Sequence, residues 1–312
     1  MSSASTVAGT ADGGASGDLR RRLLAIPSLL CGMLSVQCGA SLAKSLFPAF
    51  GPAGMVMMRT GFAAAALLIL LRVTGSTIRL RGGRSAILRV LAYGASLAVM
   101  NLLFYESLVR LPLGIAVAVE FMGPLFLAVA GSRRLGDLLW AALAIGGLLL
   151  LLDPFGGHDP VDPVGLLFAA GAAAGWALYI LTGRRLGQSV EGLAATALGM
   201  SVGALVALPF GAATISQALA HPALLLAAFG VAMLSSALPY PIEMMAMRRM
   251  STRTFAVLMS LEPGLAAVIG LVLLHEALSL RGAVAVAMVV VASLGSALFD
   301  IPPPDTREPR PD

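Results

Sequence analysis

A few polar and charged side chains interrupt long apolar stretches of this sequence. The first stretch carries Gln37, Ser41 and Lys44 at i, i+4 and i+7, so a helix would present all three on one face. Lys44 is the only lysine in the chain. An amide, a hydroxyl and an ammonium group can together hold a polar or anionic ligand, so this face is a candidate binding surface. The alternative is that the Lys44 ammonium extends to the nearer membrane interface.

Two glutamates lie close to prolines in other apolar stretches. Glu120 lies four residues before Pro124, and Glu262 directly precedes Pro263. Proline has no N–H, so in a helix the carbonyl of Glu120 loses its usual partner beside the carboxylate. We predict a polar binding locus at this position. Alternatively, Arg59 forms a structural pair with Glu120, or binds the carboxylate of a ligand.

A second polar stripe repeats the spacing of the first. Ser236, Tyr240 and Glu243 again lie at i, i+4 and i+7. This predicts a second polar face in the same kind of apolar helix. Glu243 is only one turn from Arg248 and Arg249, so an ion pair with them is at least as plausible as a ligand-binding role.

The remaining intramembrane candidates have structural alternatives. Glu106 stands four residues before Arg110, the acid-before-base order that favours a local pair on a helix. The residues that we class as structural or possible site residues are Arg59, Asn101, Glu106, Pro124, Trp176 and Pro263.

These side chains must be positioned by helices, because ten apolar runs divide the chain. Only closed helices satisfy backbone polar groups in lipid, and 58% hydrophobic with 12% charged residues suits a membrane protein. We therefore predict an all-α integral membrane bundle of ten transmembrane helices, with the fifth run at the short limit for a span. The runs are approximately 23–47, 53–71, 87–108, 113–131, 138–152, 164–182, 193–213, 224–247, 254–274 and 280–299.

The distribution of basic residues predicts the orientation of these helices. Of the 21 basic residues, 17 fall in every second gap between the runs or in the two tails. Lys and Arg near helix ends are retained in the cytoplasm, so both termini should be cytoplasmic and the Asp-rich fifth gap (Asp153, Asp159 and Asp162) should lie outside. The dispersal of the arginines over separate segments argues against nucleic-acid binding.

The chain also contains a weak internal repeat. A shift of 139 residues places Pro124 on Pro263 and aligns the first five apolar runs with the last five. Halves with an odd number of helices insert in opposite orientations, which is typical of transporters with a site at the repeat interface. We expect repeats at 23–152 and 164–299, a disordered cytoplasmic tail at 1–22, and a cytoplasmic tail at 300–312. A passive channel is the alternative.

The sequence offers little support for an enzyme. It contains no zinc-protease motif, phosphate-binding loop or paired-cysteine metal site. The "GMSVG" segment at 199–203 matches a hydrolase pattern, but small residues four apart in an apolar run more often form helix-packing faces. We expect no catalytic residues, no metal and no cofactor.

Five segments resemble one family of transporters. They are "QCGASLAKSLFP" (37–48), "PLGIAVAVEFMGPL" (112–125), "GWALYILTGRR" (175–185), "SSALPYPIEM" (235–244) and "STRTFAVLMSLEPGLAAV" (251–268). They are similar to segments of the amino-acid exporters in the EamA branch of the drug/metabolite transporter superfamily. These exporters are proteins of the bacterial inner membrane. The resemblance implies proton-driven export of small neutral amino acids of the threonine and homoserine type through a central cavity. The motif residues carried over are Gln37, Lys44, Glu120, Tyr240, Glu243 and Glu262.

An amino-acid substrate sets clear chemical requirements. A zwitterion needs a cation beside its carboxylate, which Lys44 or Arg59 would supply, and a carboxylate beside its ammonium, which Glu120 or Glu262 would supply. We expect Glu120 and Lys44 to form opposite ends of one site. The expected partners are the amino acid, protons and the lipid bilayer. The alternatives are a transporter of the same fold for a nucleoside, sugar or drug, and a membrane-embedded enzyme or scaffold.

Overall fold

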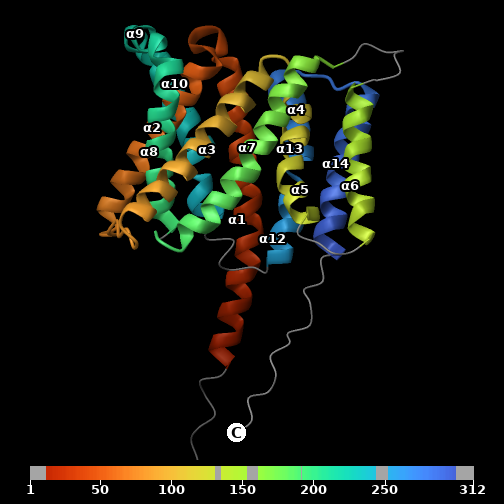
Figure 1. Cartoon of the computed structure of the whole chain (residues 1–312), viewed down its shortest axis with the longest axis horizontal. Coiled ribbons are helices and arrows are strands. Elements are labelled where there is room, and N and C mark those ends of the chain that lie inside the picture. The colour runs from red at the N-terminus through yellow and green to blue at the C-terminus, as the bar shows by residue number, and fades with distance from the viewer. Residues whose placement is uncertain (1–11, 131–134, 153–160, 191, 244–251, 300–312) are drawn as a thin grey trace, which may run out of the picture.

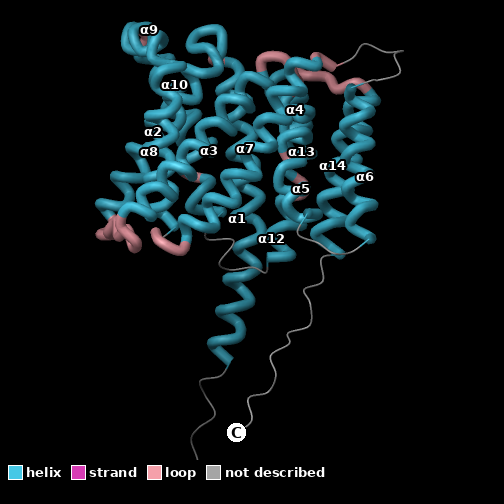
Figure 2. The backbone as a smooth tube through the Cα atoms, viewed as in Figure 1, coloured by secondary structure: helices cyan, strands magenta, loops and turns pink. Residues whose placement is uncertain are grey.

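The structure is a computed structural model that describes residues 12–130, 135–152, 161–190, 192–243 and 252–299. The described residues fold entirely into helices and their connections (Figure 2). In the part of the chain that the structure describes, nine helical segments are long and apolar enough to span a membrane, and Leu138–Leu151 is a shorter apolar helix. The ten predicted apolar runs therefore correspond to nine candidate spans and one short helix.

The helices follow the predicted runs closely. They are α1 (Asp12–Ser45), α2 (Phe47–Val73), α3 (Arg84–Leu108), α4 (Leu113–Glu120), α5 (Met122–Ala130), α6 (Leu135–Leu152), α7 (Pro163–Gly187), α8 (Gly192–Gly211), η1 (Ala212–Thr214), α9 (Ile215–Ala220), α10 (Pro222–Ala232), the π-helical η2 (Met233–Ala237), α12 (Thr252–Met259), α13 (Glu262–Leu274) and α14 (Leu280–Phe299). In the predicted disordered tail, residues 1–11 lie outside the described part, whereas 12–22 continue α1. Leucine and arginine at 19–24 are good helix formers, which is consistent with this longer helix.

The two ends of the bundle differ in charge. The N-terminal part of α1 protrudes at the lower end in Figure 1, and the turn between α2 and α3 lies at the same end. The α2–α3 connection, the last turn of α7 and the adjoining helix ends carry seven arginines at this lower end: Arg72, Arg79, Arg81, Arg84, Arg89, Arg184 and Arg185. The upper end carries α9 and the connections from α3 to α4 and from α13 to α14. We call these the basic end and the opposite end.

The centre of the bundle is α4, in which every residue is buried. It packs against α13 and α7, and α3 packs along α7 while α2 packs along α8. Helices α6 and α14 pack mainly on each other at one side (Figure 1). There Gly295 allows close approach, since a Cβ on it would lie 2.5 Å from the ring of Trp140.

Three of the described apolar runs are interrupted in mid-span near a proline. The fourth apolar run breaks between α4 and α5 at Phe121, three residues before Pro124, and the ninth breaks at Ser260 and Leu261, just before Glu262 and Pro263. In the eighth run, the π-helical η2 precedes Pro239. A proline removes one helical hydrogen bond and clashes with the preceding turn, so each break follows from the sequence. Non-helical backbone at this depth is tolerated where it is buried in protein or lines a cavity.

Candidate functional site

A polar cavity of about 120 Å³ lies where these interrupted helices meet α1, α2, α3 and α7. Its lining combines one guanidinium group and three carboxyl groups with amides, hydroxyls and aromatic rings. The lining residues are Val36, Gln37, Ala40, Arg59, Met100, Asn101, Phe104, Val117, Glu120, Trp176, Tyr179, Ser235, Tyr240, Glu243, Met259 and Glu262.

One wall of the cavity joins α1 to the start of α13. Gln37 Nε2 donates a hydrogen bond to Glu262 Oε1 at 3.1 Å, and both side chains are buried. The other acceptors, Gln37 Oε1 and Glu262 Oε2, have no hydrogen-bond partner within the described structure. Buried polar atoms are nearly always satisfied, so both oxygens are suited to accept a hydrogen bond from a water molecule or a ligand donor, and Glu262 Oε2 can also bind a proton. Glu262 also lies in the first turn of α13, where the helix dipole favours negative charge.

The opposite wall is built around Arg59 on α2. Its Nε donates to Ser236 Oγ at 2.9 Å, its Nη1 donates to Tyr105 OH at 3.1 Å, and its Nη2 donates to Ser235 O at 3.2 Å. The guanidinium also lies over the Tyr105 ring, 5.5 Å from the centroid. These contacts fix a buried cation at the cavity with a defined orientation.

Pro239 explains why the Ser235 carbonyl is available to Arg59. In a regular helix this carbonyl would accept from the N–H of residue 239, and proline has none. The π-helical turn bridges the interruption, with Leu238 N donating to Met233 O at 3.0 Å. A sequence feature local to the eighth run therefore supplies an acceptor for a side chain of α2. Single π-helical turns occur frequently at functional sites.

Aromatic side chains from α3 and α7 form a third wall. Tyr93 OH donates to Tyr179 OH at 2.8 Å, and the two rings stack with centroids 4.8 Å apart. Trp176, one turn before Tyr179, is held edge-on against Phe121 at 5.5 Å. Asn101 on α3 donates from Nδ2 to Leu97 O at 2.8 Å, so its Oδ1 is the atom suited to accept from a ligand.

The cavity unites most of the side chains selected from the sequence. Its lining includes eight of them: Gln37, Arg59, Asn101, Glu120, Trp176, Tyr240, Glu243 and Glu262. Pro124 and Pro263 lie at the helix breaks and do not line the cavity. Whether the lining residues bind a substrate stays a prediction.

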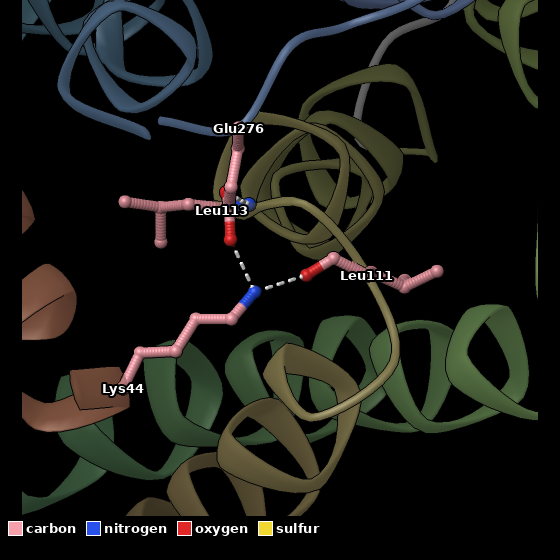
Figure 3. Close-up of polar contacts among 4 residues, drawn as sticks. All are labelled: Lys44, Leu111, Leu113 and Glu276. Carbon is pink, nitrogen blue, oxygen red and sulfur yellow. Dashed lines mark hydrogen bonds and ion pairs between the residues drawn. The ribbon is translucent and has the colours of Figure 1, made fainter. Parts of the chain in front are cut away.

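Lys44 does not line the cavity, which corrects the expectation that it faces Glu120. Its Nζ donates to Glu276 Oε1 at 2.5 Å and to Leu111 O at 2.7 Å (Figure 3). Seven residues of helix span about 10.5 Å, so the stripe that begins at Gln37 extends beyond the cavity before it reaches Lys44. Ser41 is buried between them and also does not line it.

The expected pairs of Glu106 with Arg110 and of Glu120 with Arg59 are not formed among the described residues. Arg110 Nη1 donates to Asp162 Oδ2 at 3.2 Å, and the described residues include no ion pair between Arg110 and Glu106. Helix α3 ends at Leu108, so Arg110 leaves the helical geometry that the i, i+4 pairing requires.

Within the described part of the chain, Glu120 forms no ion pair with Arg59, because the guanidinium is held by Tyr105 and η2. Arg248 and Arg249, the proposed partners of Glu243, lie outside the described residues. Asp153 and Asp159 of the Asp-rich gap do as well.

Sequence reasoning missed Tyr105, Tyr179, Ser235 and Glu276. Tyr179 lies one helical turn after Trp176, so the same face could have been extended to include it. Ser235 was missed because a period of 3.6 residues selects Ser236, whereas the π-helical turn brings both serines to Arg59. No local pattern connects Glu276 with Lys44, which lies 232 positions earlier.

Comparisons with known proteins agree with this architecture. Residues 163–298 match the model of the EamA-like transporter family. The threonine/homoserine exporter RhtA of Escherichia coli K12 is 44% identical over 284 residues, covering 90% of this chain and 95% of that protein. RhtA of Salmonella typhimurium LT2 is 45% identical over 275 residues, covering 88% of this chain and 92% of its own length. A crystal structure of a protein 20% identical in sequence, with a TM-score of 0.56, covers 87% of this chain and 96% of that chain, and shows the fold alone.

Proposed function

Because the chain belongs to the EamA-like transporter family, as a relative of its threonine/homoserine exporters, we propose that it exports small neutral amino acids of that type across the cytoplasmic membrane. It is a multi-pass membrane protein. The observation that carries the proposal is the joint lining of one cavity by Arg59 and by Glu120, Glu243 and Glu262. A zwitterion requires both charges at one site.

The contacts of Arg59 suggest how the substrate carboxylate binds. A guanidinium has five N–H donors, and Ser236, Tyr105 and Ser235 accept from three of them. The remaining two donors are on Nη1 and Nη2, where a carboxylate can bind both. The substrate ammonium then binds near Glu262 Oε2, which is buried without a partner in the described structure. Asn101 Oδ1 is suited to accept from the hydroxyl of threonine or homoserine.

The size of the cavity favours a small substrate over a drug. Sites for drug-sized ligands are typically ~300–1,000 Å³, whereas this cavity is about 120 Å³. This supports an amino acid over an amphipathic drug as the substrate, with the drug exporter of the same fold as the second candidate.

Proton coupling follows from the imbalance of charge in the lining. Three carboxyl groups face one guanidinium, and uncompensated charge is costly in a buried environment. A substrate ammonium or a proton relieves this imbalance, and each would occupy the same carboxyl oxygens. We propose that proton and substrate compete for Glu262 and Glu120, so that proton entry drives amino-acid exit. Neither a metal nor an organic cofactor has a part in this scheme.

The proposed topology has both termini in the cytoplasm and two inverted five-helix repeats. The breaks before Pro263 and after Glu120 support the repeat, because they occur in corresponding apolar runs of the two halves. The described arginines at the basic end support a cytoplasmic location for that end. Helix α6 would complete the ten spans despite its shorter apolar segment.

The proposed function is tested by efflux of a panel of labelled amino acids from bacterial cells that lack their own exporters. Expression should increase the efflux of threonine and homoserine and lower their internal concentrations. A vesicle experiment with an imposed pH gradient then tests coupling. Export of a cationic dye with unchanged amino-acid levels would favour the drug exporter. Absence of amino-acid efflux together with a hydrolytic activity would favour the membrane enzyme.

A further inference from the structure

Lys44 belongs to a compact cluster that is separate from the cavity. We define the Lys44 cluster as Lys44, Leu111, Leu113 and Glu276. The Lys44 ammonium donates to both Glu276 Oε1 and Leu111 O, and the backbone N–H of Leu113 donates to Glu276 Oε2 at 2.7 Å (Figure 3). Each carboxylate oxygen of Glu276 therefore has its own donor.

The cluster connects three parts of the bundle that are distant in sequence. Lys44 is in the last turn of α1, Leu111 and Leu113 flank the start of α4, and Glu276 lies just after α13. The first two parts belong to the first half of the chain and the third to the second half. Glu276 is itself anchored to α13, because its N–H donates to Gly270 O at 3.1 Å. The cluster thus fastens the two halves to each other at the opposite end of the bundle.

The same helices carry the cavity. Ala40 lies one turn before Lys44, Val117 lies one turn after Leu113, and both line the cavity. Separation of α1 and α4 from the loop after α13 would therefore open a path to the cavity from the opposite end. The Lys44 and Glu276 side chains are 20% and 17% exposed, so water can solvate the two charges once they separate.

We propose that the Lys44 cluster is a gate that closes the outer side of the cavity and breaks when the transporter opens outward. This inference rests on the proposed transport function and adds a residue, Glu276, that acts in the cycle without contacting the substrate. Charge-assisted hydrogen bonds are about twice as strong as neutral ones. The three in this cluster therefore stabilise the closed state of the transporter at a single contact between the two halves. Rocking of two halves around a fixed site requires such contacts to form and break in each cycle.

The Arg110–Asp162 pair provides a matched control. It also joins the first half to the second at the opposite end, but its side chains are 43% and 34% exposed and neither residue lines the cavity. Exposed pairs contribute little to stability because water screens them. Loss of this pair should not open the cavity.

The test measures access to the cavity from outside. A single cysteine is placed at Val117, with Ala40→Cys as a second reporter, after Cys31→Ser and Cys38→Ser remove the native thiols. Intact cells are treated with a membrane-impermeant methanethiosulfonate, and the labelling rate is compared for Glu276→Gln, Lys44→Met, the double variant and Asp162→Asn. Glu276→Gln keeps an acceptor for Leu113 N–H and removes only the charge. The double variant leaves no unpaired charge, so it controls for instability.

We expect Glu276→Gln, Lys44→Met and the double variant to accelerate labelling by roughly tenfold, equivalent to about 1.4 kcal/mol, with Asp162→Asn unchanged. The double variant should not exceed the larger single effect, because both changes break the same contact. If the double variant elutes like the wild type and its labelling rate is unchanged, the gate is overturned, even if amino-acid efflux is normal. Accelerated labelling without efflux of any tested amino acid would support the gate and reject the proposed substrate.

Discussion

Gln37 and Glu262 lie 225 positions apart in the sequence, yet Gln37 Nε2 donates to Glu262 Oε1 at 3.1 Å inside the bundle. The contact joins α1 in the first half to α13 in the second. It orients Glu262 so that Oε2 is left buried without a partner among the described residues. This arrangement makes Glu262 the first carboxyl group to test.

Replacement of Glu262 by glutamine should strongly reduce export while the protein still inserts and folds. Glutamine keeps the shape and an acceptor for Gln37, but it cannot bind an ammonium as an anion or exchange a proton. Efflux of labelled threonine should fall by roughly tenfold or more, since hydrogen bonds to charged groups contribute about 1.5–3 kcal/mol. Glu106→Gln is the control, because this half-buried acid on α3 does not line the cavity. Equal efflux by both variants would remove Glu262 from the proposed site.

Arg59→Lys should impair export although the positive charge is retained. A lysine ammonium cannot reproduce the planar fork that contacts Ser236, Tyr105 and Ser235 and still offer two donors to a carboxylate. We expect a higher substrate concentration for half-maximal efflux, measured by varying the internal threonine concentration. Tyr105→Phe removes only the acceptor at Nη1 and should have a smaller, severalfold effect, because a single hydrogen bond contributes about 1 kcal/mol. The opposite order of effects would argue against carboxylate binding by Arg59.

Pro239→Ala should reduce transport without reducing thermal stability. Alanine restores an N–H that competes with Arg59 Nη2 for Ser235 O, and it favours a regular helix over the π-helical turn. The expected result is an unchanged or higher unfolding temperature in detergent together with lower threonine efflux. If the variant transports like the wild type, the π-helical turn does not contribute to the orientation of Arg59.

The topology can be tested with two conservative cysteine substitutions. In a background with Cys31→Ser and Cys38→Ser, Ala277→Cys should react with an impermeant maleimide in intact cells, whereas Ser76→Cys should react only after the membrane is permeabilised. The reason is that Ser76 lies in the arginine-rich connection after α2 and Ala277 lies in the connection after α13 at the opposite end. The reverse pattern would contradict a cytoplasmic location of the basic end.

The contribution of Asp162 to the stability of the fold should not change with pH in the physiological range. Its pKa is lowered because the carboxylate accepts backbone hydrogen bonds from Gly165 and Val164 and pairs with Arg110. A carboxyl group with a lowered folded-state pKa stabilises the fold above its unfolded pKa, and this stabilisation is lost as the pH falls through the lower folded value. The pH profile of efflux between pH 5 and 8 should therefore be the same in Asp162→Asn and in the wild type. A shifted profile would assign Asp162 a role in proton coupling.

The sequence alone predicted the membrane helices and half of the residues that line the cavity. Hydrophobic length and the alternating distribution of arginine depend on local composition, so the helices from α1 to α14 follow the predicted runs. Gln37, Glu120, Tyr240, Glu243 and Glu262 were identified because polar groups are costly in lipid and are retained mainly where they function. The helix breaks were also foreseeable, since the missing N–H of proline is a property of the residue.

Only the tertiary structure decided the partners of these side chains. The position of Lys44 on the stripe with Gln37 is fixed by helical spacing, but its pairing with Glu276 depends on how α13 and its following loop pack on α1. The sequence could not exclude an ion pair between Arg59 and Glu120, because the acceptors that Arg59 contacts on η2 and α3 are brought together only by packing. Helical periodicity determines which face a residue occupies, and long-range packing determines what that face meets.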